Sequence, residues 1–98
     1  MIYVARRRRF DEGLALIERA TALRPGDAGL WYSLGWCCEF AAHETRRRSS
    51  PTGIEPRILY ERAAAAFRAC LALHPGGKLA DDATDLLDQV ENELRASP

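Results

Sequence analysis

Two stretches of the chain repeat one spacing of small, apolar and proline residues at an offset of 50 positions. The repeated residues are Gly13, Ile17, Ala20 and Pro25 in the first copy and Ala63, Phe67, Cys70 and Pro75 in the second. Steps of three and four residues keep side chains on one face of an α-helix, and a proline ends the segment. The chain is therefore expected to contain two equivalent helices, each followed by a turn.

Apolar residues recur at helical spacing along most of the sequence, which predicts an all-α fold of four helices. The expected ranges are Phe10–Leu23, Ala28 to at least Ala42, Pro56–His74 and Leu79–Arg95. Asp27 is a favourable N-cap for the second helix, and Pro56 suits the first turn of the third. Residues 1–9 are either further helical turns or a frayed terminus. The Ser- and Pro-containing stretch at 49–53 predicts a loop.

Several residues of the central region share the spacing of a known repeat. They are Trp31, Leu34, Gly35, Ala63, Phe67 and Pro75. Together they resemble the signature of the tetratricopeptide repeat (TPR) family. The resemblance implies antiparallel helix hairpins stacked as a short TPR-like solenoid, with about two repeats and a C-terminal capping helix. Its parts would be a partial first repeat (1–26), a second repeat with an extended hairpin (27–76) and the capping helix (77–96).

The repeat is longer than the family period of about 34 residues, by about 16 residues. Because Asp27–Gly35 fits the start of a normal unit, the excess lies between Cys38 and Tyr60. Both helices of this hairpin are therefore expected to be longer than usual. Small residues at Gly35 and Ala63 would let the two helices approach closely, with Phe67 filling space around the crossing.

In TPR proteins the first helix of each unit lines a concave surface that takes a segment of another protein. Carried over to this sequence, the resemblance implies partner-binding residues Tyr32, Trp36, Glu39 and Phe40. Trp36 lies off the apolar stripe of its helix, and tryptophan beside tyrosine is typical of binding hot spots. The alternative is that Trp36 packs on the last helix of the same chain.

Charge is balanced overall, with 14 basic and 14 acidic residues, but unevenly placed. The predicted basic edge comprises Arg6, Arg7, Arg8, Arg9, Arg46, Arg47 and Arg48. The acidic residues of the last helix are Asp81, Asp82, Asp85, Asp88 and Glu91. The two regions predict self-pairing or an acidic partner, and the alternative is that both simply face water. The zero net charge argues against nucleic acid as a partner.

The residue types of a metal site are present without its spacing. They are Cys37, Cys38, Cys70, His43 and His74. No Cys–His pair has an evident third, orienting group, and no glycine loop is suited to phosphate. We therefore expect no metal, no cofactor and no catalytic residues. No apolar run approaches the about 20 residues that span a bilayer, so we expect a cytoplasmic protein with no membrane partner.

The sequence thus favours a non-catalytic scaffold for protein–protein interaction, with a partner that it does not identify. The alternative is a self-assembling structural element that forms a homodimer through its incomplete repeat and charged edges. This alternative rests on length, because repeat arrays generally need about three units to bury a continuous core. With about two units, the helix Phe10–Leu23 should keep one side uncovered.

Overall fold

The computed structural model describes the backbone of residues 2–47 and 55–96, and the side chains of residues 12–44 and 55–96. It contains four α-helices, which are α1 (Ile2–Leu23), α2 (Ala28–Arg47), α3 (Pro56–Leu73) and α4 (Lys78–Ala96). These ranges hold no strand, so the all-α prediction is confirmed. The predicted loop at 49–53 lies outside the described residues.

The helices begin and end close to the predicted positions, with two extensions. α1 starts at Ile2, so residues 2–9 continue the helix that the apolar spacing predicts only from Phe10. Arginine is a good helix former, which allows the Arg6–Arg9 run to stay helical. α2 likewise continues to Arg47. Pro56 occupies the first turn of α3, where its missing N–H costs no helical hydrogen bond.

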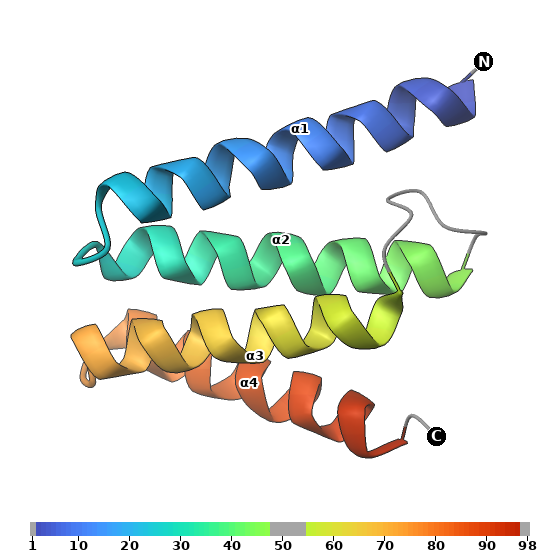
Figure 1. Cartoon of the computed structure of the whole chain (residues 1–98). Helices are drawn as coiled ribbons and strands as arrows, with labels where there is room; N and C mark the ends of the chain where they lie inside the picture. Colours follow the sequence, from blue (N-terminus) through green and yellow to red (C-terminus); the bar gives the residue numbers. More distant parts are fainter. Residues whose placement is uncertain (1, 48–54, 97–98) are drawn as a thin grey trace.

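Consecutive helices run antiparallel and pack side by side (Figure 1). α3 is the central element, because it packs against both α2 and α4. α2 also reaches α4 over a smaller contact. Within the described ranges, α1 packs against α2 alone. Figure 1 shows α1 close to α2 at the turn that joins them and diverging from it toward the N-terminus.

The core lies where α2 crosses α3. Its largest fully buried side chains are Tyr60, Phe67, Leu59, Val90, Cys38 and Cys70. Gly35 faces the ring of Phe67 so closely that a Cβ at this position would lie 2.7 Å from a ring carbon. Ala63 is fully buried on the same helix as Phe67. The small residues therefore allow the close approach that the spacing predicts.

The turn from α1 to α2 is held by two side chains. Asp27 caps α2, since its Oδ1 accepts a hydrogen bond from the Leu30 N–H at 3.2 Å. The indole Nε1 of Trp31 donates to the carbonyl oxygen of Pro25 at 2.8 Å. Trp31 thus joins the first turn of α2 to the end of α1, in addition to its partly buried packing. The turn from α3 to α4 ends at Gly77, whose φ of 90° favours glycine.

α4 covers one side of α3 through an apolar stripe. Ala80, Ala83 and Val90 are buried, and the leucines around them are partly buried. Arg68 of α3 adds a surface ion pair to Glu91 of α4 at 2.8 Å. In the part of the chain that the structure describes, no helix has both the length and the apolar character needed to cross a membrane.

Candidate partner-binding surface

An aromatic strip runs along the outer side of α2. Trp36 and Phe40 are four residues apart, so they project from one face of the helix. Their rings stack in parallel, with centroids 5.6 Å apart and an interplanar angle of 6°. Trp36 is 50% exposed and Phe40 is 43% exposed. We call this pair the aromatic strip, and it is the largest apolar feature that α2 presents to solvent.

The position of Trp36 follows from the helical register of α2. Gly35, Cys38 and Ala42 point into the core, so Trp36 is turned away from it. Its ring partner is Phe40 of its own helix, and half of its surface stays exposed. Half of the Trp36 side chain is thus covered and half is open to solvent. Tyr32 lies one turn earlier and is partly buried, with its ring edge-on to Phe67 at 6.0 Å.

Glu39 lies beside the strip, in a small pocket of about 190 Å³ where α2, α3 and α4 meet. The pocket is lined by Glu39, His43, Tyr60, Gln89, Val90, Asn92 and Glu93. The Glu39 side chain is only 12% exposed, and His43 Nε2 lies 3.7 Å from its Oε1. The other oxygen, Oε2, is buried with no hydrogen-bond partner among the described residues. This oxygen is thus a buried acceptor without a donor in the described part of the chain.

Burial sets the electrostatics of this pocket. It raises the pKa of Glu39, and the nearby His43 opposes the shift through charge and a hydrogen bond. On its other side, His43 Nδ1 lies 3.1 Å from the hydroxyl oxygen of Tyr60. The His43 and Tyr60 rings also meet edge to face at 5.5 Å. His43 therefore bridges the buried Tyr60 and the carboxylate of Glu39.

The sequence identified Glu39 but not the residues around it. His43 could have been found, because it follows Glu39 by four residues and so shares its helix face. Tyr60 and the α4 residues Gln89 and Glu93 carry no such local signal. Tyr60 reaches the pocket through the packing of α3 on α2, and Gln89 and Glu93 reach it through the packing of α4, whose register the sequence does not fix.

The thiols of the chain are poorly suited to nucleophilic chemistry. Burial raises the pKa of Cys38 to about 12, with a further increase from Glu18 and a partial decrease from Arg62. Burial also raises the pKa of Cys37 and of Cys70. All three cysteines are free thiols, and at neutral pH they stay protonated. No group of three or more potential metal ligands occurs in the described part of the chain.

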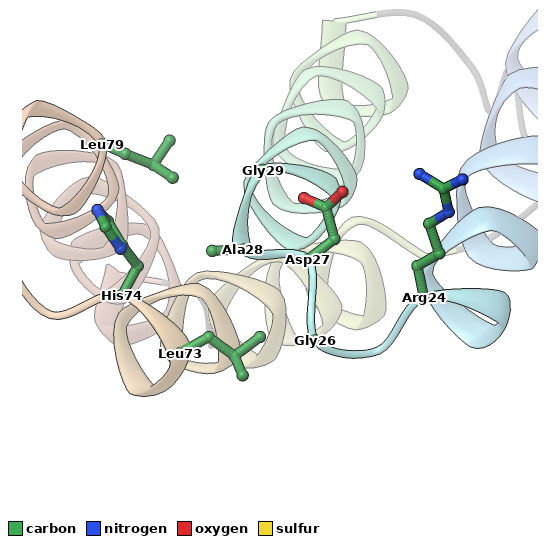
Figure 2. Close-up of a pocket in the computed structure, with 8 residues that line it drawn as sticks. All are labelled: Arg24, Gly26, Asp27, Ala28, Gly29, Leu73, His74 and Leu79. Atoms are coloured by element: carbon green, nitrogen blue, oxygen red, sulfur yellow. The ribbon is translucent and has the colours of Figure 1, made fainter.

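A second, shallower hollow lies between the two turns at the other end of α2 (Figure 2). Arg24 and Asp27 come from the first turn, whereas His74 and Leu79 come from the end of α3 and the start of α4. Asp27 is already engaged as the cap of α2. The polar side chains are spread over separate segments and do not converge on one point, so this hollow has no binding geometry comparable to the Glu39 pocket.

The predicted basic edge falls largely outside the described side chains. The backbone of Arg6–Arg9 lies in α1 and that of Arg46 and Arg47 at the end of α2, while Arg48 is not described. Figure 1 places these two helix ends at the same end of the molecule. On the acidic helix α4, Asp82 pairs with Lys78 at 3.4 Å and Glu91 pairs with Arg68. Part of the acidic face is thus neutralised within the chain.

Comparison with models of known families, with curated proteins and with solved structures found no match for this chain. Its function is therefore inferred from the residues and their geometry.

Proposed function

We propose that the protein is a non-catalytic scaffold that binds a segment of another protein along α2. The stacked, half-exposed pair of Trp36 and Phe40 carries this proposal. Exposing a large aromatic side chain to water is unfavourable. Such side chains are also among those that most often dominate the free energy of binding. Because half of the Trp36 side chain lies open to solvent, contact with a partner would account for its presence.

The arrangement of the helices supports a TPR-like scaffold as the frame for this surface. Each helix packs on the next, and α2 and α4, the first helices of successive units in that scheme, also touch. The tight crossing of Gly35 against Phe67 fits the role of the signature residues. In this scheme the aromatic strip and Glu39 lie on the concave side, where TPR proteins take their partners.

The chemistry of the surface defines the segment that would fit it. Trp36 and Phe40 favour an apolar or aromatic side chain that stacks on their exposed faces. One turn away, the Glu39 carboxylate lines a pocket and its side chain is 12% exposed, so a donor from the segment would fit there beside the apolar contact. The expected ligand is therefore a short peptide with an apolar anchor next to a lysine, an arginine or a free backbone N–H.

The same surface offers no reacting groups, which favours binding over catalysis. A cysteine reacts as a nucleophile in its thiolate form, and burial keeps the three thiols protonated. The Glu39–His43–Tyr60 chain has a carboxylate, an imidazole and a phenol, but the Tyr60 side chain is fully buried, so its hydroxyl is not accessible to a substrate. Its best-supported role is to position the Glu39 acceptor.

Selection from a random peptide display library tests the proposal, because it does not require the natural partner. We expect Trp36→Ala to weaken binding of the selected peptides by at least about 2 kcal/mol. Ile58→Ala is the matched control, because Ile58 is a similarly exposed apolar residue on α3. Trp31→Phe leaves Trp36 as the sole tryptophan, so its fluorescence reports peptide contact directly.

Two results would contradict the proposal. One is equal loss of binding in Trp36→Ala and Ile58→Ala. The other is global unfolding of Trp36→Ala by circular dichroism, since a half-exposed residue should contribute little to the fold.

A further inference from the structure

The outer side of α1 carries apolar residues that no described part of the chain covers. α1 contacts α2 through Leu14 and Thr21, which are almost fully buried. On the opposite side, Leu16 is 66% exposed and Leu23 is 77% exposed. These two leucines are seven residues apart and so lie on one face, two turns from each other. α1 thus has one buried face and one uncovered apolar face.

A hollow on this face has the shape of a helix-packing site. It is lined by Glu12, Ala15, Leu16 and Arg19. Their spacing of i, i+3, i+4 and i+7 is the set of four residues that receives one side chain of a facing helix. Ala15 is small, which leaves room between the longer side chains around it. The hollow is therefore suited to a leucine from another helix.

We propose that a second copy of this chain occupies the hollow, with the two α1 helices crossing antiparallel. The two-fold axis passes between Ala15 and Leu16, so that Leu16 of each copy lies over Ala15 of the other. Such a contact is isologous, because the same patch serves both subunits. The proposal concerns the free side of α1 and is independent of the aromatic strip on α2.

Charge complementarity favours a second copy over a foreign segment. Glu12 and Arg19 lie at equal distances before and after the midpoint between Ala15 and Leu16. An antiparallel crossing at that midpoint brings Glu12 of one copy to Arg19 of the other, and symmetry forms the pair twice. Glu12 and Arg19 are both exposed in the single chain. The face thus carries an apolar centre flanked by charges that complement themselves.

Charge reversal tests this geometry in solution. Sedimentation velocity over a concentration series should show a dimer for the unmodified chain. Glu12→Arg and Arg19→Glu each turn two attractive pairs into two repulsive ones, and each should weaken dimerisation by about tenfold or more. An equimolar mixture of the two variants should dimerise again, because a mixed pair restores both contacts. The double variant should likewise recover.

Further variants distinguish the α1 contact from an interface elsewhere on the chain. Leu16→Ala should weaken the dimer, whereas Trp36→Ala should leave it unchanged, which separates the α1 face from the aromatic strip. Circular dichroism should show native helicity for both charge variants, because both sites are exposed.

Three outcomes would overturn the proposal. A monomer at every concentration would assign the face to a foreign partner. Dimers that are insensitive to the charge variants would place the interface elsewhere. Single variants that weaken the dimer without recovery in the mixture would exclude the Glu12–Arg19 pairing.

Discussion

α1 and α3 carry the same spacing of residues but experience different surroundings. In α3 the repeated residues Ala63, Phe67 and Cys70 are completely buried between α2 and α4. In α1 the corresponding residues Gly13, Ile17 and Ala20 are only partly buried. The spacing therefore determines which residues share a helix face, while neighbouring helices determine whether that face is covered.

The difference extends to the ends of the two helices. Leu23 and Leu73 occupy matching positions before their prolines, yet Leu23 is 77% exposed and Leu73 44% exposed. α3 gains part of its cover from α4, which has no counterpart against the outer side of α1 in the described chain. The copy in α1 thus keeps the residue pattern of the copy in α3 without its burial. The apolar surface left exposed on α1 is what a second subunit can cover.

Alanine substitution at the matched positions Phe67 and Ile17 gives the largest expected effect on the free energy of unfolding. Phe67→Ala should lower the free energy of unfolding by about 3–5 kcal/mol, because it removes a fully buried ring at the centre of the core. Ile17→Ala should cost only about 1–2 kcal/mol, since Ile17 is partly exposed. Urea denaturation of both variants at low protein concentration measures the difference. Equal losses would mean that α1 is as well covered as α3.

Alanine substitutions at two glycines should change the stability of the protein in opposite directions. Gly35→Ala should destabilise by about 1–3 kcal/mol, because the new Cβ would lie 2.7 Å from the Phe67 ring. Gly13→Ala should stabilise by roughly 0.5–1 kcal/mol, since no atom lies within 4 Å of its Cβ position and alanine favours a helix interior. Thermal unfolding of both variants would show the contrast.

A double variant identifies the cause of the loss at Gly35. In a Phe67→Leu background the shorter side chain relieves the contact, so Gly35→Ala should cost less than in the unmodified chain. An undiminished cost would show that the crossing of α2 and α3 is not limited by this ring.

Local signals in the sequence predicted much of the fold. The helices and the Asp27 cap follow from residues near one another, and the close packing of Gly35 with Phe67 was expected from the repeat signature that the sequence resembles. The hydrogen bond from Trp31 to Pro25 was not predicted, although the two residues are only six apart. It depends on the shape of the turn, which the spacing of apolar residues does not encode.

The candidate site was less predictable than the fold. The sequence placed Trp36 off the apolar stripe of its helix and left partner binding and packing on the last helix as alternatives, and the structure shows it half-exposed. The pocket beside it also needs Tyr60 from α3 and Val90 from α4. α4 has no Trp-x2-Leu-Gly segment to fix its register, and its apolar stripe predicts only which side of the helix faces the core. Only the packed helices show which α4 residues reach Glu39.

The smallest predicted effect concerns two glutamates, one largely buried and one exposed. It compares how the two environments affect a charged side chain. Glu39 lies between packed helices, whereas Glu18 of α1 is exposed. Because burial raises the pKa of Glu39 in the folded chain, folding favours its protonated form. Stability from this group is therefore greatest below the ordinary glutamate pKa of about 4.3, and it declines as pH rises through that value toward the raised pKa.

Glu39→Gln should remove this decline, because its amide does not titrate. At neutral pH the variant should be more stable than the unmodified chain by on the order of 0.5 kcal/mol, and the two should converge in acid. Glu18→Gln is the control for the loss of one exposed carboxylate of α1, outside both proposed interfaces. The urea midpoints of the unmodified chain and the two variants, measured from acidic to neutral pH, test this prediction. A Glu39→Gln profile that declines as steeply as that of the unmodified chain would mean that another group causes the decline, and that burial of Glu39 does not couple its protonation to folding.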